Sequence, residues 1–330
     1  MDKHVFKLFC LAVLLGIFAI ALGGCKSITG FSINEIPHET SKGQEIYFCP
    51  RDDCGKAYSL LIGTANNSVH CAFYDIDLKN VIMALANKSK AAEVMLVMDK
   101  SNYKEQVKGE GVKLDDDGQL MHNKFCVIDD EIVITGSFNP TDNDNFKNNN
   151  NVIVSYSNAL ASNYEQEFQE LWNSEFGKGG KVVIPKINLN NKSIENYFCP
   201  EDDCASRTAS LIQEAKRSIY FMTFSFTNEG IGNALIKKKA LDIRGVFDSE
   251  QASIQYSQFK RLKEIGIKVK KDSNRYKMHH KVFVIDNETV LTGSFNPTSN
   301  ADTNNDENII IIHDKRIADG FLDEFDRVWG

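Results

Sequence analysis

Two segments of the sequence carry a histidine, a lysine and an aspartate at the same spacing, H-x-K-x4-D. Their members are His122, Lys124 and Asp129 in the first segment and His279, Lys281 and Asp286 in the second. Both segments lie in apolar runs that predict β-strands. Because side chains alternate between the two faces of a strand, the histidine and the lysine of each segment point the same way. Each segment therefore presents a titratable imidazole together with a cation.

A second group of polar residues follows each segment, where the next strand is expected to end. Both copies read Gly-Ser-Phe-Asn, and the candidate phosphate-binding residues are Ser137, Asn139, Ser294 and Asn296. Glycine allows close approach of the backbone, while serine hydroxyls and asparagine amides can donate hydrogen bonds to phosphate oxygens. Together with the histidines and lysines, these residues indicate the chemistry of a phosphate ester.

The chain is an internal duplication. YFCPRDDC at Tyr47–Cys54 returns as YFCPEDDC 150 residues later, and the segment Met121–Thr141 returns 157 residues later as Met278–Thr298. Such self-similarity predicts two copies of one structural unit. We place the first copy at residues 46–185 and the second at residues 186–330.

Hydrophobic periodicity predicts the same order of elements in both copies. The expected helices are 56–66, 78–90 and 159–172 in the first copy and 205–217, 229–239 and 315–329 in the second, and the expected strands include 69–74, 93–98, 218–226 and 243–247. This alternation predicts a layered α/β fold. We expect the copies to pack face to face about a pseudo-twofold axis.

The two H-x-K-x4-D-x6-G-S-x-N segments resemble the paired HKD motifs of the phospholipase D superfamily. The resemblance implies an α-β-α layered fold in which two repeats share one active site. It also implies a phosphoric diester hydrolase, in which one neutral histidine attacks phosphorus and the other, protonated, gives its proton to the leaving alkoxide. The lysines and the serine and asparagine donors would stabilise the transition state, so neither a metal nor another cofactor is expected.

The copies differ at the position that lies 28 residues after each motif histidine, which is Asn150 in the first copy and Glu307 in the second. In the family, a polar residue near this position orients the histidine. We therefore expect Glu307 beside His279, where a carboxylate raises the pKa and favours an acid, and Asn150 beside the nucleophile His122.

Asp129 and Asp286 have two readings, as support for catalysis and as turn residues that bond to the local backbone. The sequence leaves both open.

The N-terminal residues have the pattern of an export signal. Lysines at positions 3 and 7 precede an apolar run over residues 8–22, which is shorter than a comfortable bilayer span. The following Gly-Gly-Cys resembles a bacterial lipobox, so Cys25 is a lipidation candidate, with a plain signal peptide or an uncleaved anchor as alternatives. We expect residues 1–24 to be a signal peptide, residues 25–45 a tether, and the protein to be extracytoplasmic, as a membrane-anchored lipoprotein or secreted.

Four cysteines form two identically spaced pairs, Cys49 with Cys54 and Cys199 with Cys204. In an exported protein a disulfide within each pair is the favoured interpretation. A four-cysteine zinc site is an alternative, and a redox role is the least favoured because redox motifs have the spacing C-x-x-C. Cys71 and Cys126 lie in apolar strands, where isolated cysteines are usually small buried hydrophobes.

Composition narrows the choice among substrate classes only slightly. The chain has 38 Lys and Arg against 45 Asp and Glu, a formal net charge of −7, which argues mildly against a dedicated nucleic-acid binder. A membrane-tethered enzyme acting on phospholipid is the leading hypothesis. A metal-independent endonuclease is the alternative, and a non-catalytic binding module comes third. Because one chain carries both motifs, we expect a monomer without an obligate protein partner.

Overall fold

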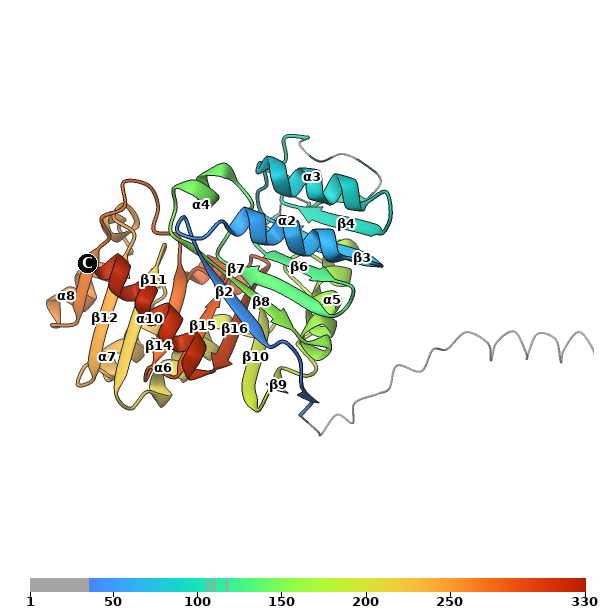
Figure 1. The fold of residues 1–330 in the computed structure, drawn as a ribbon. Helices are drawn as coiled ribbons and strands as arrows, with labels where there is room; N and C mark the ends of the chain where they lie inside the picture. The colour runs from blue at the N-terminus through green and yellow to red at the C-terminus, as the bar shows by residue number, and fades with distance from the viewer. Residues whose placement is uncertain (1–35, 106, 108, 110, 117) are drawn as a thin grey trace, which may run out of the picture. The chain divides into compact units, whose positions relative to one another are not determined.

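The computed structural model describes residues 36–105, 107, 109, 111–116 and 118–330 (Figure 1). The expected signal peptide and the lipidation candidate Cys25 lie outside the described residues. Every helix within these ranges is too short or too polar to cross a bilayer.

The two copies contain the same elements in the same order, except that the second has an additional 3-10 turn and an additional helix, α8. The first copy consists of β2 (Gln44–Cys49), α2 (Cys54–Thr64), β3 (Ser68–Phe73), α3 (Lys79–Lys88), β4 (Glu93–Met98), β5 (Val112–Leu114), β6 (Lys124–Ile128), β7 (Ile132–Gly136), α4 (Asp142–Phe146), β8 (Asn150–Tyr156) and α5 (Asn158–Trp172). The second consists of β10 (Lys192–Cys199), α6 (Cys204–Glu214), β11 (Ser218–Thr223), α7 (Glu229–Lys237), β12 (Asp242–Phe247), a 3-10 turn (Gln251–Ser253), α8 (Gln258–Glu264), β13 (Lys268–Lys271), β14 (Lys281–Ile285), β15 (Thr289–Gly293), α9 (Ser299–Thr303), β16 (Glu307–His313) and α10 (Lys315–Trp329). The strands β1 (His38–Glu39) and β9 (Lys186–Leu189) precede them.

Each copy forms its own sheet, with equivalent strands in equivalent places. The first sheet has seven strands in the order β2-β8-β7-β6-β3-β4-β5, and the second has nine in the order β1-β9-β10-β16-β15-β14-β11-β12-β13. The strands β3, β4 and β5 run parallel, as do β11, β12 and β13, and the motif strands β6 and β14 pair antiparallel to β3 and β11. The equal strand order agrees with the duplication seen in the sequence.

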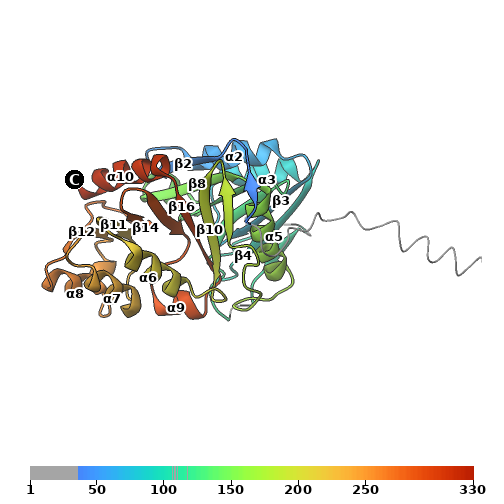
Figure 2. The same ribbon diagram turned by 90° about the horizontal axis from the view of Figure 1, so that it is seen from below.

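Among the described residues, three hydrophobic clusters lie between the layers of helices and sheets, which Figure 2 shows from below. One cluster contains apolar residues of α5 and α10 together with strands of both sheets, and it fills the space between the sheets. The other two lie beneath α2 and α3 on the first sheet and beneath α6, α7 and α8 on the second. Each sheet is therefore covered on both faces, which explains fully apolar runs such as the isoleucines 309–312 of β16. The expected layered α/β fold is confirmed.

The expected tether at residues 25–45 is wrong in its last part. His38 and Glu39 pair in parallel with Asn188 and Leu189 of β9, so this segment belongs to the edge of the second sheet. The Glu39 carboxylate also accepts a hydrogen bond from the Ala159 backbone N–H at the start of α5, at 2.9 Å. These backbone and side-chain bonds order a stretch whose polar composition suggested a linker.

The interpretation of Cys71 and Cys126 as isolated buried hydrophobes is also wrong. The two residues face each other in the register of β3 and β6 and are joined by a disulfide. Antiparallel neighbours lie close enough for this bond, with 4.1 Å between their Cα atoms. The bond links the two central strands of the first sheet, one of which carries Lys124.

Candidate active site

The two motif histidines lie where the copies meet. The backbone N–H of His122 donates to the carbonyl of Asp306 at 3.0 Å, and that of His279 donates to the carbonyl of Asn149 at 2.8 Å. Both imidazoles are buried, and the charge of Lys281, from the second copy, acts on His122 in the first. Each motif is therefore hydrogen-bonded to the other copy, and the two copies build one site.

The partners of the histidines are exchanged between the copies. The Nδ1 atom of His122 lies 2.8 Å from Oε2 of Glu307, and Nδ1 of His279 lies 2.9 Å from Oδ1 of Asn150. The expectation that Glu307 lies beside His279 and Asn150 beside His122 is wrong. The pseudo-twofold arrangement brings the start of β16 to the first histidine and the start of β8 to the second.

This exchange reverses the expected electrostatics of the two imidazoles. Burial lowers the pKa of His122, and the Glu307 carboxylate opposes that shift. Burial, followed by the ammonium groups of Lys281 and Lys124, lowers the pKa of His279 well below its usual value. A weaker counter-charge is present there, because Oδ2 of Asp144 lies 3.7 Å from Nδ1 of His279. In the free protein burial therefore favours the neutral form of both imidazoles, and the negative charge of a bound phosphodiester would offset the lysine charges that oppose protonation of His279.

The motif lysines are buried beside the histidines. Nζ of Lys124 donates to the carbonyl of His122 at 2.6 Å, and Nζ of Lys281 donates to that of His279 at 2.7 Å. Burial lowers the pKa of Lys124 to about 8, and burial together with the charge of Lys124 lowers the pKa of Lys281 well below its usual value. An anion entering the site favours the charged form of both lysines, because it removes part of their mutual repulsion.

Two aromatic residues, which the motif did not reveal, form walls beside the histidines. The ring of Tyr74 meets His122 edge-on with 4.6 Å between centroids, and Phe224 meets His279 in the same way at 4.9 Å. Nζ of Lys124 also lies 4.9 Å from the centroid of Tyr74. Both residues directly follow the observed strands β3 and β11 and are 150 positions apart. The duplication alone could have suggested them.

The two motif serines position the histidine partners. Oγ of Ser137 donates to Oδ1 of Asn150 at 3.0 Å and accepts from the backbone N–H of Asn151 at 3.0 Å. Oγ of Ser294 accepts from the backbone N–H of Asn308 at 2.9 Å. These bonds fix the first residues of β8 and β16.

The two asparagines that follow these serines have different surroundings. The side-chain amide of Asn139 donates to Asp144 at 2.9 Å. The position equivalent to Asp144 is Ala301, so the amide of Asn296 has no such acceptor. The side-chain oxygens of both asparagines lack a hydrogen-bond partner among the described residues. Asn296 is therefore the better placed of the two to donate to a substrate oxygen.

The structure favours the second reading of Asp129 and Asp286, as turn residues that bond to the local backbone. The Asp129 carboxylate accepts hydrogen bonds from the backbone N–H groups of Asn66, Asn67 and Ser68 at 2.7–2.9 Å, and Asp286 bonds residues 216–218 equivalently. Both lie at the far end of the motif strand from the histidine, at positive φ angles of 53° and 56°. These bonds lower the pKa of both carboxyls against the opposing effect of burial. Each aspartate ties its hairpin to the preceding strand.

A buried polar network crosses between the copies beneath the histidines. Thr135 donates to Asn308 at 2.8 Å, Asn308 donates to Asn123 at 2.7 Å, and Asn123 donates to Glu167 at 3.0 Å. The equivalent hydrogen bonds that start from the second copy join Thr292 to Asn151, Asn151 to His280, and His280 to Glu324. Sequence reasoning read His280 as structural, and its bonds to Asn151 and Glu324 agree with that reading.

The four paired cysteines are joined as Cys49–Cys54 and Cys199–Cys204, so they do not form the alternative zinc site. In the sheets Cys49 lies opposite Asn150, and Cys199 lies opposite Glu307. Each disulfide therefore braces the strand that neighbours a histidine partner.

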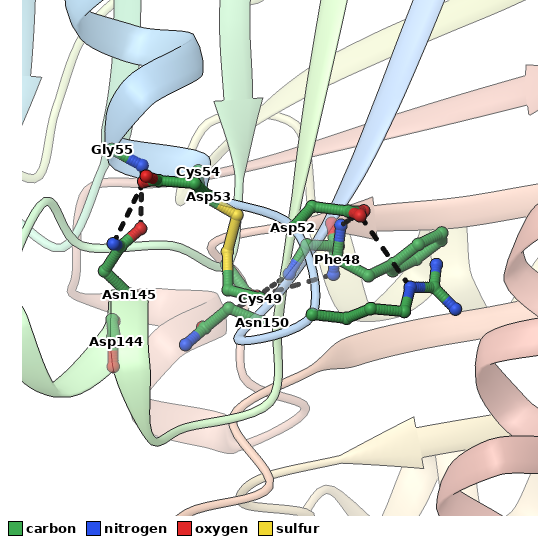
Figure 3. The surroundings of a disulfide bond; sticks show 12 residues. Phe48, Cys49, Asp52, Asp53, Cys54, Gly55, Asp144, Asn145 and Asn150 are labelled. Carbon is green, nitrogen blue, oxygen red and sulfur yellow. Dashed lines mark hydrogen bonds and ion pairs between the residues drawn. A yellow bond between two sulfur atoms is a disulfide. The ribbon is translucent and has the colours of Figure 1, made fainter.

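The surroundings of Cys49–Cys54 extend this brace to α4. Figure 3 shows Asn145 of α4 bonded to Asp53 at 3.1 Å and to the backbone N–H of Gly55 at 2.7 Å. The start of α2, which carries Cys54, is thereby tied to the short helix that contains Asp144.

A family model described as "Cardiolipin synthase, PLD-like domain" matches residues 60–172 and 209–329. The chain belongs to this phospholipase D-like family. A mitochondrial cardiolipin hydrolase of Chlamydomonas reinhardtii is 32% identical over 126 residues, which cover 38% of this chain and 56% of that protein. A phospholipase D of Rickettsia conorii is 33% identical over 136 residues, which cover 41% of this chain and 68% of that protein.

The chain spans about half to two thirds of the length of the cardiolipin hydrolases that it matches, between 50% and 65%. Among solved structures, the phosphatidylserine synthase of Haemophilus influenzae covers 86% of this chain and 85% of its own, with a TM-score of 0.62 and 10% identity. This likeness shows a common fold that includes both copies.

Proposed function

We propose that the protein is a phosphodiesterase of the phospholipase D type that hydrolyses a phospholipid, or transfers its phosphatidyl group, through a phosphohistidine intermediate. The observation that carries the proposal is the pair of buried imidazoles whose Nδ1 atoms are held by Glu307 and Asn150. This leaves the Nε2 atoms of His122 and His279 for chemistry, beside Lys124 and Lys281. The relatives in the comparison are a phospholipase D and a cardiolipin hydrolase, and both favour a lipid substrate.

His122 is the nucleophile in this proposal, on a ground different from the one that the sequence suggested. An imidazole that is phosphorylated at Nε2 while Nδ1 keeps its proton is a cation. The Glu307 carboxylate, 2.8 Å from Nδ1 of His122, stabilises that cation, whereas Asn150 offers only an amide dipole to His279. The covalent intermediate is therefore more stable on His122.

The reaction proceeds in two steps, formation and breakdown of the phosphohistidine. The Nε2 lone pair of His122 forms a bond to phosphorus while the bond from phosphorus to the leaving oxygen breaks, and protonated His279 gives its proton to that oxygen. His279, now neutral, takes a proton from water or an alcohol, whose oxygen displaces His122 from phosphorus. Lys124, Lys281 and the Asn296 amide bind the non-bridging oxygens throughout.

The location and assembly of the enzyme complete the proposal. An export signal at residues 1–24 with lipidation of Cys25 would place the catalytic copies outside the cytoplasm and tether them to a membrane. Since both halves of the site belong to one chain, the active form is a monomer.

The test is hydrolysis by the purified protein in the presence of a chelator. Phosphatidylcholine and phosphatidylglycerol vesicles are supplied in one arm and plasmid DNA in the other, with the His122→Ala variant as the control. We expect release of the lipid headgroup by the wild type and none by the variant. Cleavage of plasmid with intact lipid would make the protein an endonuclease. Failure to hydrolyse lipid, plasmid and bis-p-nitrophenyl phosphate would leave only a binding role.

A further inference from the structure

An exposed cluster of cationic and aromatic side chains borders the site beside His279. Its members, which we call the basic rim, are Phe146, Lys147, Arg275, Tyr276 and Lys277. Phe146 and Tyr276 are 61% and 43% exposed, unusually high fractions for large apolar side chains. The three cationic side chains are exposed as well.

The basic rim is held together across the two copies. Nζ of Lys147 lies 5.5 Å from the centroid of Tyr276, and the guanidinium carbon of Arg275 lies 5.3 Å from it. The side chain of Asn274 donates to the carbonyl of Lys147 at 3.0 Å. The end of α4 in the first copy and the segment before the second motif thus form one surface.

This surface continues into the site. The carbonyl of Lys277 accepts a hydrogen bond from the backbone N–H of Asn149 at 2.9 Å. The carbonyl of Asn149 accepts one from the backbone N–H of His279. Nζ of Lys277 lies 5.5 Å from the centroid of Phe224, the aromatic wall beside His279. The basic rim therefore adjoins the segment that carries His279 and the aromatic wall beside it.

The duplication provides an internal control for this surface. Subtracting or adding the 157-residue offset gives the equivalent positions Thr303, Asn304, Gly118, Gln119 and Leu120, which we call the neutral rim. The neutral rim has the same place in the other copy but contains neither a cation nor an aromatic ring, and the exposed Asp116 lies two residues before Gly118. The scaffold therefore does not require the side chains of the basic rim.

We propose that the basic rim docks the mouth of the site onto the surface of an anionic phospholipid bilayer. Aromatic side chains favour the headgroup region of a membrane, and cations near an anionic leaflet add attraction. Because the chain carries a net charge of −7, approach to such a surface depends on a local cationic patch. The inference rests on the proposed phospholipid substrate.

The one-sided charge favours a bilayer over a nucleic acid. An internal phosphodiester of a polynucleotide continues as a polyanion on both sides of the scissile bond, so it would need cations on both rims. A bilayer presents its phosphodiesters from one side only. The contrast between the basic and neutral rims fits the second geometry.

The test measures vesicle binding separately from hydrolysis. The full chain with His122→Ala is sedimented with phosphatidylcholine vesicles that either contain or lack phosphatidylglycerol. The ratio of the two affinities is the readout, because any N-terminal lipid anchor contributes to both. Adding K147Q and R275Q should weaken binding to the anionic vesicles about 30-fold while leaving the neutral vesicles unaffected.

The matched control adds Q119E and T303E on the neutral rim, which lowers the net charge by the same two units. We expect this control to bind the anionic vesicles as the unmodified chain does. Equal losses in both variants, or no preference of the unmodified chain for anionic vesicles, would overturn the inference. The inference would also be overturned if K147Q and R275Q weakened binding to a single-stranded oligonucleotide but left binding to the anionic vesicles unchanged. If the chain with His122 intact binds anionic vesicles through the basic rim but hydrolyses no lipid, the proposed function is wrong while the docking surface is supported.

Discussion

Replacing Glu307 with glutamine tests how the site divides the work between its histidines. The substitution keeps the size of the side chain but removes the charge that lies 2.8 Å from Nδ1 of His122. A cationic ring centred about 4 Å from a carboxylate is stabilised by about 4 kcal/mol at an effective dielectric constant of about 20. Loss of that term from the transition state corresponds to a decrease in kcat of about a thousandfold. We expect a decrease of that order in the hydrolysis of bis-p-nitrophenyl phosphate.

The pH dependence of kcat in the Glu307→Gln variant, which reports the pKa values of the enzyme with its anionic substrate bound, identifies the role of His122. The Glu307 carboxylate opposes the lowering of the pKa of His122 by burial, so its removal lowers that pKa further. A nucleophile must be neutral, and its titration sets the acid limb of the profile. We therefore expect the acid limb to move to lower pH. If His122 were the acid, the alkaline limb would move to lower pH instead.

The reciprocal variant Asn150→Asp is the matched control, because it adds a carboxylate beside His279. It should raise the pKa of His279 and move the alkaline limb to higher pH. Unchanged kcat in Glu307→Gln, or radioactive phosphate trapped on the His279 peptide, would refute the assignment of His122 as the nucleophile.

Three further predictions concern stability. Burial raises the pKa of the Asp306 carboxyl to about 8. Its contribution to stability is therefore full below the unfolded pKa of about 3.8 and is lost as pH rises through 8. In urea unfolding, Asp306→Asn should be more stable than wild type by about 2–4 kcal/mol at pH 9, with a smaller gain at pH 5. Asp129→Ala should lower the free energy of unfolding by about 1–3 kcal/mol with unchanged kcat, and loss of activity in a folded variant would restore its catalytic role. Replacing Cys71 and Cys126, which are 55 residues apart, with alanine should cost about 4 kcal/mol, roughly twice the effect of removing either disulfide whose cysteines are five residues apart, as measured by denaturant unfolding.

Local patterns predicted those features that depend on neighbouring residues in the chain. The turn at Asp129 and Asp130 requires two residues at positive φ, and both have it, at 53° and 56°. The disulfide between Cys71 and Cys126 depends instead on the register of β3 against β6, which no local pattern specifies. The pairing of β1 with β9 depends in the same way on how the first residues of the fold meet the second copy.

The exchange of Glu307 and Asn150 has the same origin and a functional consequence. A spacing of 28 residues shows which residue follows each histidine, but a pseudo-twofold axis decides which residue faces it. Because the partner comes from the other copy, neither His122 nor His279 has its Nδ1 bond until the copies dock. Docking also pairs Asn308 with Asn123, and undocked copies would expose that polar network. Assembly of the site and formation of the interface between the copies are therefore the same physical event, so substitutions in the network should affect stability and activity together.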